Sequence, residues 1–428
     1  MKRRVILMAA WLLLAGMASS RVATAQDTIK VGVLHSLSGT MAISETTLKD
    51  TILMMIDEQN KKGGLLGKKL RAVVVDPASD WPLFAEKAAQ LLEKDKVAVV
   101  FGCWTSVSRK SVLPVFEKDN GLLFYPVQYE GEESSKNVIY TGAAPNQQAI
   151  PAVDYLMKEV GVKRWVLEGT DYVYPRTTNK ILEAYLLAKG VKPEDITINY
   201  TPFGHSDWQT RVAAIKKFGS SGKKTAVVST INGDANVPFY KELGNQKISA
   251  EDIPVVAFSV GEEELSGLDT KPLVGHLAAW NYFESISTPA NKAFIDQWHT
   301  FIKKPKRTTN DPMEAHYIGF NLWVKAVQKA GTTDVEKVLA ALPGLETPNL
   351  TGGIARMLPN HHITKPVYIG EVKADGQFNV VWKSTGTVPG DAWSDYLPGS
   401  KDIDADWVTL KCGNYNKVTK KCSGQNYK

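Results

Sequence analysis

A tryptophan, a threonine and a serine follow one another where a short apolar segment is expected to turn into a helix. In the stretch FGCWTSVSRK, Trp104, Thr105 and Ser106 lie between the apolar run 97–101 and a helical pattern over 106–119. The first N–H groups of a helix lack acceptors within the helix, and the helix dipole adds positive potential at that end. Two hydroxyls and an indole there suit a small ligand that carries a carbonyl or carboxylate oxygen. The alternative is a residue that only caps an ordinary helix.

Further polar and aromatic side chains follow other strand-like runs. Ligands of open parallel sheets bind beyond the carboxyl ends of the strands. This rule gathers more candidates for ligand contact, namely Tyr125, Tyr172, Asn232, Asp234, Ser259 and Glu262. The sequence has no Walker-type glycine loop, no GxSxG motif and no His and Cys residues at metal-ligand spacing. We therefore expect a binding site without catalytic residue, metal or cofactor. A secreted hydrolase that uses Cys103 or Ser106 is an alternative for which no general base is visible.

Strands and helices alternate along most of the chain, and this alternation must position the candidates. Apolar runs typical of strands cover 29–34, 70–75, 97–101, 122–125, 164–167, 196–200, 226–229 and 255–259. Helical periodicity covers 48–60, 84–92, 106–119, 149–160, 177–189, 209–218 and 237–243. This alternation of strands and helices predicts an α/β fold with doubly wound, parallel sheets. Because one small sheet cannot hold so many strands, we expect two lobes. After residue 345 the pattern changes to turns and to the β-like runs 366–371 and 378–383.

The N-terminus has the features of an export signal. Lys2, Arg3 and Arg4 precede the apolar run 5–18, and Ala-Thr-Ala fits a cleavage site after Ala25. The run is too short to span a bilayer comfortably, so we expect a soluble mature protein in the periplasm, without membrane insertion after cleavage. Removal of the signal lowers the formal charge from +6 to +2. Nothing in the basic residues that remain predicts nucleic-acid binding.

Two cysteines lie close together near the C-terminus. A polar loop separates Cys412 from Cys422, and in an oxidising compartment this spacing favours a disulfide over two free thiols. Cys103 would then remain as a buried, inert thiol. The tail also carries three alternating acids that could offer oxygens to Ca²⁺, although the glycine of an EF-hand loop is absent; these are Asp402, Asp404 and Asp406.

Several segments together resemble the urea-binding proteins of bacterial urea ABC transporters. The resemblance rests on GCWTSVSRK, FYPVQYEG, DYVYPR, VSTINGD and HHITKPVYIG, and it covers about residues 28–390. The chain is similar, less closely, to the amide-sensing regulators of amidase operons. Both groups belong to the leucine/isoleucine/valine-binding, type I periplasmic binding family. The resemblance implies two α/β lobes joined by three crossovers, a ligand in the cleft between them, and delivery of that ligand to the permease subunits of an ABC transporter.

The resemblance also implies roles for individual residues. Ser106 matches the serine that holds the polar head of the ligand, and Trp104 and Tyr125 match aromatic residues that line the site. Tyr172 matches the tyrosine of the second lobe that closes over the ligand. Gln128 is a further candidate for ligand contact. Val127 departs from the amide sensors, which have a threonine at that position, so no hydroxyl contact is expected there.

Urea fits this polar and aromatic set because it is planar and neutral, with one carbonyl acceptor and four N–H donors. The alternatives are a short-chain amide and a branched-chain amino acid bound by the same fold. An amino acid would need a partner for its ammonium group and room for an aliphatic side chain. We expect lobe 1 at 26–145 plus 281–350, lobe 2 at 146–280 plus 351–390, and a C-terminal tail at 391–428.

Overall fold

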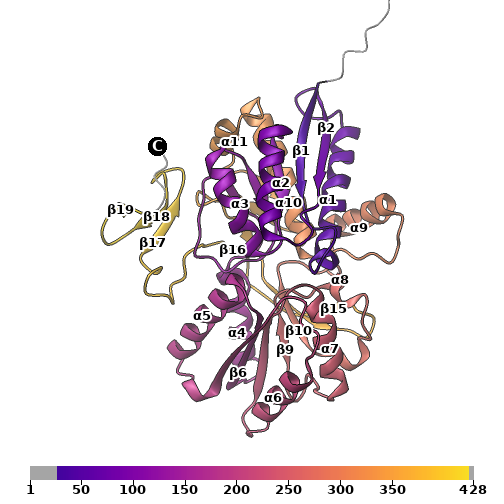
Figure 1. Ribbon diagram of the computed structural model, residues 1–428, viewed down its shortest axis with the longest axis vertical. Helices are drawn as coiled ribbons and strands as arrows, with labels where there is room; N and C mark the ends of the chain where they lie inside the picture. The colour runs from indigo at the N-terminus through magenta and orange to yellow at the C-terminus, as the bar shows by residue number, and fades with distance from the viewer. Residues whose placement is uncertain (1–26, 424–428) are drawn as a thin grey trace, which may run out of the picture.

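Two α/β lobes and a small β-structured unit make up the protein. The computed structural model describes residues 27–423, so the predicted signal peptide lies outside the described residues. Figure 1 shows one lobe above the other, with the C-terminal unit beside the upper lobe. The predicted two-lobed α/β fold is confirmed. The exact lobe limits at 145, 280, 350 and 390 stay a prediction.

A five-stranded parallel sheet forms the first lobe, in the order β2-β1-β3-β4-β5. Its strands are β1 (Thr28–Leu34), β2 (Lys69–Val75), β3 (Val99–Gly102), β4 (Leu123–Tyr125) and β5 (Val138–Tyr140). The helices from the same part of the chain are α1 (Ala42–Lys61), α2 (Trp81–Ala89) and α3 (Ser106–Lys118). Three later helices share its core, α9 (Pro289–Ile302), α10 (Asp311–Ala330) and α11 (Val335–Ala341).

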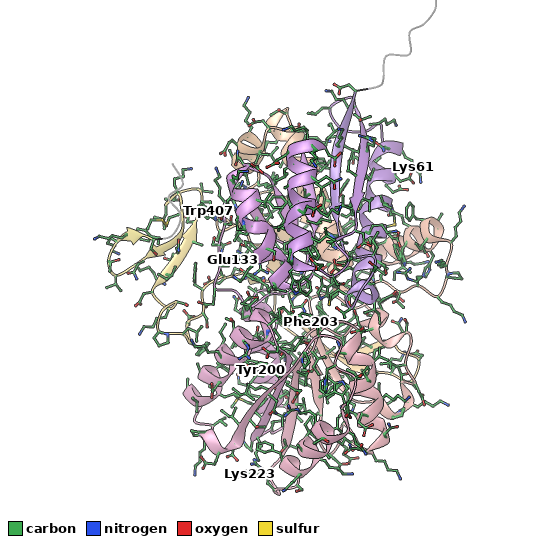
Figure 2. The ribbon with its side chains drawn as sticks, viewed as in Figure 1. Lys61, Glu133, Tyr200, Phe203, Lys223 and Trp407 are labelled. Carbon is green, nitrogen blue, oxygen red and sulfur yellow. A yellow bond between two sulfur atoms is a disulfide. The ribbon has the colours of Figure 1, made fainter. Side chains whose placement is uncertain are left out.

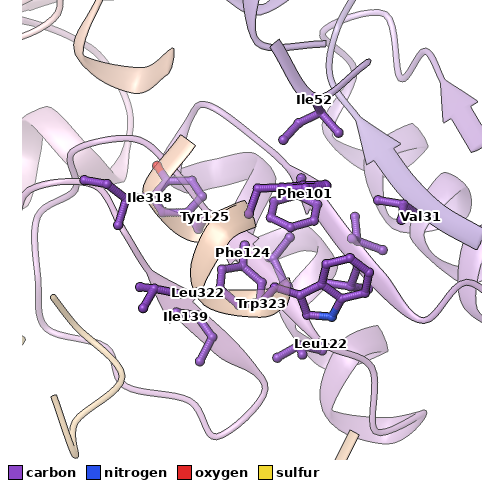
Figure 3. Packing of buried hydrophobic residues seen from close by; sticks show 14 of the residues in the cluster. Val31, Ile52, Phe101, Leu122, Phe124, Tyr125, Ile139, Ile318, Leu322 and Trp323 are labelled. Carbon is purple, nitrogen blue, oxygen red and sulfur yellow. The ribbon is translucent and has the colours of Figure 1, made fainter. Parts of the chain in front are cut away.

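The core of this lobe forms where strands that are apolar on both faces meet helix α10. The rings of Phe101 and Phe124 stack with centroids 5.2 Å apart, and Trp323 of α10 meets Phe101 edge-on at 6.1 Å. Figure 3 shows this packing, with Ile318 and Leu322 on the same helix. Helix α10 is buried around most of its circumference. A helix of that kind has no clear polar face to reveal its period, and the sequence analysis did not predict it.

A seven-stranded sheet forms the second lobe, in the order β15-β14-β10-β9-β8-β6-β7. Its strands are β6 (Arg164–Thr170), β7 (Ile196–Thr201), β8 (Thr225–Thr230), β9 (Val255–Ala257), β10 (Leu277–Trp280), β14 (Tyr368–Val372) and β15 (Phe378–Lys383). Its helices are α4 (Ala149–Lys158), α5 (Val173–Ala188), α6 (Gln209–Gly219), α7 (Asn236–Asn245) and α8 (Glu262–Leu265). The sheet is parallel from β7 to β10, but β14 and β15 run antiparallel. The β-like runs predicted at 366–371 and 378–383 form this antiparallel hairpin at the edge of the sheet, and the predicted parallel-sheet lobe is confirmed.

Short β-ladders complete the chain. Strand β11 (Glu346–Pro348) pairs with β12 (Ile354–Arg356), and β13 (Thr364–Lys365) pairs with β16 (Val388–Pro389). The C-terminal unit consists of β17 (Ile403–Asp406), β18 (Cys412–Asn416) and β19 (Lys421–Cys422). No helix within residues 27–423 has the length and apolar character that a bilayer crossing requires.

A disulfide joins Cys412 of β18 to Cys422 of β19, while Cys103 is free and buried. The alternating acids of β17 have protein partners. Asp404 lies 3.4 Å from Lys417 Nζ, and Asp406 accepts hydrogen bonds from two backbone N–H groups that follow it. Within residues 27–423 no three His, Cys, Asp or Glu side chains are grouped as a metal ion requires.

Candidate functional site

The turn between β3 and α3 places three adjacent candidates at the cleft side of the first lobe. Trp104, Thr105 and Ser106 are each at most 2% exposed. Thr105 caps α3, because its hydroxyl oxygen accepts a hydrogen bond from Ser108 N at 3.1 Å. Ser106 is the first residue of α3, and its hydroxyl donates a hydrogen bond to Glu130. Thr105 thus has the capping role that the sequence left open, while Ser106 is bound to a carboxylate.

A buried ion cluster lies directly behind Ser106. Arg109 donates to Glu133 Oε1 at 2.7 Å and to Glu130 Oε1 at 3.2 Å, and Lys110 Nζ reaches Glu133 Oε2 at 2.7 Å. Burial lowers the pKa of Arg109, but the two carboxylates outweigh burial and hold that pKa well above its ordinary value. Burial raises the pKa of Glu133, but Arg109 and Lys110 together bring it down to about 2. Arg109 and Glu133 are therefore both charged at neutral pH.

Aromatic rings enclose the guanidinium of Arg109. Its central carbon lies 4.7 Å from the ring centroids of both Tyr125 and Tyr129, which is the geometry of a cation–π contact. The Tyr125 hydroxyl donates to the backbone oxygen of Trp104. Tyr125 therefore packs inside the first lobe and shapes the turn that carries Trp104.

Two side-chain hydrogen bonds join predicted site residues of the first lobe to predicted site residues of the second. Trp104 Nε1 donates to Asn232 Oδ1 at 3.1 Å, and Gln128 Nε2 donates to Ser259 Oγ at 2.6 Å. All four side chains are buried. The structure thus pairs these four candidates across the boundary between the lobes.

The beginning of α1 makes a second set of contacts across the cleft. Ser44 Oγ donates to Glu264 Oε1 at 2.7 Å, and the backbone N–H of Asp234 donates to Thr40 O at 3.1 Å. Gly233 has φ +71°, and a Cβ atom there would lie only 2.6 Å from Thr40 O. Only glycine fits this turn when the lobes are closed. The Asp234 side chain is exposed, so it is the backbone of this candidate that contacts the first lobe.

Aromatic side chains line the edge of the same cleft. Phe203, from the loop after β7, lies 4.8 Å from the Tyr172 ring and 5.2 Å from the Trp81 ring of the first lobe, centroid to centroid. Figure 2 shows Phe203 at the level where the two lobes meet. Burial raises the pKa of Tyr172, and the neighbouring hydroxyl of Tyr125 and carboxylate of Glu130 raise it further. Tyr172 is therefore neutral and lies in the electrostatic neighbourhood of Glu130.

Glu262 lies apart from this group. Its Oε1 accepts a hydrogen bond from the backbone N–H of Glu284 at 2.8 Å, and it lines a surface hollow together with Arg307 and Gln377. Burial raises its pKa well above the ordinary value. The side chain that reaches the first lobe is Glu264, two residues further along α8.

Gln128 Oε1 and the hydroxyl of Tyr174 are buried at the boundary between the lobes and form no hydrogen bond of ordinary geometry among residues 27–423, although the polar side chains of Gln128 and Ser259 lie within reach of Tyr174. Gln128 and Tyr174 are at most 3% exposed. A buried polar group without a partner costs about 1–3 kcal/mol. A ligand that donates to Gln128 and accepts from Tyr174 would recover that free energy.

The sequence analysis missed several residues that build this site, namely Arg109, Glu130, Tyr174, Phe203 and Glu264. A partial indication was available for the first two. Arg109 lies three residues after Ser106 in a predicted helix, a spacing that puts both on one face. The acidic run from Glu130 follows the next strand end along the chain.

The chain is similar in sequence and in structure to known proteins. The family model described as "periplasmic binding protein domain" matches residues 29–399. The Leu/Ile/Val-binding protein BraC3 of Rhizobium johnstonii is 26% identical over 355 residues, which are 80% of this chain and 90% of that protein. A protein of Geobacillus stearothermophilus named limonene hydroxylase is 30% identical over 124 residues, 28% of this chain and only 22% of that protein. An ABC transporter solute-binding protein of Rhodopseudomonas palustris HaA2, solved with p-hydroxybenzoic acid, has a TM-score of 0.73 at 22% identity, with 85% of this chain and 98% of that chain covered.

Proposed function

This chain belongs to the periplasmic binding protein domain family, and we propose that, as the solute-binding protein of an ABC transporter, it captures urea or another short neutral amide. The ligand lies in the cleft between the lobes and is delivered unchanged to the transmembrane permease subunits. The export signal predicted at residues 1–25 supports a location in the periplasm. The ligand contacts are those of Trp104, Ser106, Gln128, Tyr172 and Ser259, with Glu130 and Tyr174 added.

The hydrogen bond from Ser106 to Glu130 carries the proposal. Because the hydroxyl hydrogen of Ser106 points to Glu130 and its oxygen already accepts a hydrogen bond from Arg109 at 3.2 Å, the serine can offer a ligand only its remaining lone pair. Gln128 Oε1 is a second free acceptor. A ligand for this cleft should therefore be rich in N–H donors, as urea is. A ligand carboxylate at the same place would meet Glu130, whose charge only Arg109 and Lys110 offset.

A branched-chain amino acid is the second candidate. The named relative from Rhizobium, which is similar over most of both chains, supports this candidate better than it supports urea. The ammonium group of an amino acid could bind Glu130. Its aliphatic side chain, however, needs room where Trp104 meets Asn232 and Gln128 meets Ser259.

A ligand panel separates these candidates. We expect isothermal titration calorimetry of the mature protein to show binding of urea and weaker binding of acetamide and formamide, because these have fewer N–H donors. p-Hydroxybenzoate should give no heat, since it brings a carboxylate to Glu130, and leucine should give none, since its aliphatic side chain lacks room beside Trp104 and Gln128. Tight leucine binding without a urea response would establish the second candidate instead. Sustained ammonia release from urea by the pure protein would contradict a binding function.

Ser106→Ala tests the position of the site. Loss of the hydroxyl removes one polar contact with the ligand and one of the hydrogen bonds that the Glu130 carboxylate accepts, so urea affinity should fall about 10- to 100-fold. Ser111→Ala is the matched control, because Ser111 lies on the same helix and its hydroxyl donates to Val107 O within that helix. Calorimetry measures the urea affinity of both variants, and a melting curve shows whether each of them is folded. Unchanged urea affinity in a Ser106→Ala protein that melts like the wild type would put the site elsewhere.

A further inference from the structure

The C-terminal unit lies beyond the part of the chain that matches the periplasmic binding protein domain. The family model ends at residue 399, while β17, β18 and β19 with their disulfide lie between residues 403 and 422. The similar solute-binding protein of Rhodopseudomonas palustris is covered over 98% of its length but covers only 85% of this chain. Figure 1 shows the unit beside the first lobe, reached by a long connection from β16, which is drawn between the two lobes.

Residues 392–400, which lead into this unit, form three hydrogen bonds with Glu132 of the first lobe. Glu132 N donates to Ala392 O, and Glu132 Oε1 accepts from Ser394 N at 3.0 Å. Its other carboxylate oxygen accepts from the hydroxyl of Ser400. Glu132 is thus bound by residues 392–400 through both its backbone and its side chain.

The C-terminal unit itself also contacts the loop that contains Glu132. Trp407 Nε1 donates to Ser134 Oγ at 3.1 Å, and a Cβ atom at Gly413 would lie 3.0 Å from Ser134 O. Trp393 Nε1 donates to Gly413 O at 2.9 Å, which joins the leading segment to β18. Figure 2 shows Trp407 next to the part of the first lobe that carries Glu133.

The other anchor of this segment is in the second lobe. The ring of Tyr396 meets the ring of Tyr185 of α5 edge-on, with centroids 4.9 Å apart, and packs against the core of that lobe. Asp391 N donates to Asn146 Oδ1 at 3.2 Å, next to α4. Residues 391–413 therefore contact both lobes.

The loop held in this way contains the acids of the ligand site. Glu130 and Glu133 point inward to Ser106 and Arg109, while Glu132 between them points outward to residues 394 and 400. Gly131 and Glu132 have φ values of +69° and +58°. A non-glycine residue in this conformation is strained and persists only when its surroundings hold it.

We propose that residues 391–422 are an interlobe strap, which fixes the loop 130–135 and so positions Glu130 against Ser106. Because the strap is anchored on α5 of the second lobe, the shape of this loop is coupled to the relative position of the lobes. Opening of the cleft then also releases Glu130. The effect on ligand affinity rests on the proposed function, whereas the effect on the loop does not.

Hydrogen–deuterium exchange of the full-length mature protein without ligand tests the strap. In Glu132→Ala, which removes the acceptors for Ser394 and Ser400, the amides of 130–135 should exchange faster, while exchange elsewhere and the melting temperature stay near the wild type. Glu132→Gln retains an acceptor oxygen and should restore slow exchange in part. Tyr396→Ala should also speed exchange at 130–135, although Tyr396 belongs to the anchor on the second lobe.

Asp395→Ala is the matched control, because this exposed side chain lies between Ser394 and Tyr396, and it should leave the loop unchanged. Urea affinity of Glu132→Ala should fall about 2- to 30-fold. Unchanged exchange at 130–135 in Glu132→Ala, or in Tyr396→Ala, would overturn the strap. A wild type that fails to bind urea would overturn the proposed ligand, and the exchange data would still decide on the strap.

Discussion

Arg109→Met is expected to lower the free energy of unfolding by about 3–5 kcal/mol and to abolish urea binding, because it leaves two buried carboxylates without their shared cation. Glu130 and Glu133 both depend on Arg109. The rings of Tyr125 and Tyr129 would also lose the guanidinium that lies against them. Guanidinium chloride unfolding measures the change without the complication that urea is the proposed ligand.

Arg176→Met is the control for this substitution. Arg176 also forms an ion pair with a carboxylate, Asp171, and lies over a tyrosine ring. Its side chain is 56% exposed, and an exposed pair of this kind contributes only about 0–1 kcal/mol. A loss below 1 kcal/mol in Arg109→Met, comparable to the control, would mean that the buried cluster does not stabilise the fold.

We expect a large loss of stability in acid, caused by Glu133. The pKa of this carboxyl is about 2 in the folded protein, below its ordinary value of 4.5. Its ionised form therefore stabilises the fold fully above pH 4.5, and that contribution is lost as the pH falls toward 2. The difference between the folded and the ordinary pKa of Glu133 corresponds to about 3 kcal/mol of folding stability. Guanidinium unfolding between pH 6 and pH 2 should show the decline.

Glu133→Gln separates this carboxyl from the other acids of the chain. The variant should be less stable than the wild type at pH 7, because Arg109 loses a charged partner, and its stability should depend less on pH below 4.5. Glu93→Gln, at an exposed pair with Lys118, should retain the acid dependence of the wild type. The same acid decline in Glu133→Gln and in the wild type would assign the effect to other groups.

The turn that carries Trp104, Thr105 and Ser106 was predictable from sequence because local patterns determine it. The apolar run before Gly102 and the hydroxyls at Thr105 and Ser106 predict a strand, a turn and a capped helix, and the structure has all three. Likewise, the two α/β lobes follow from the alternation of short apolar runs and helical periods.

The partners within the site could not be predicted in this way, because they depend on chain segments that only the tertiary fold brings together. Glu130 approaches Ser106 through a loop with two left-handed residues, and no strand or helix period marks that loop. Glu262 and Glu264 lie in one run of acids, and only the direction of the short helix α8 decides which of them faces the first lobe.

The one free thiol of this protein has a practical consequence for measuring its motion. Cys103 is fully buried, and burial raises the pKa of its thiol, while the other two cysteines are oxidised to a disulfide. Maleimide and iodoacetamide dyes react with accessible thiolates, so the native chain offers them no ready target. A single cysteine introduced at the exposed rim position 234 would carry a fluorophore beside Thr40, at a contact that breaks when the lobes separate. The protein is thereby suited to conversion into an optical reporter without prior removal of any native cysteine.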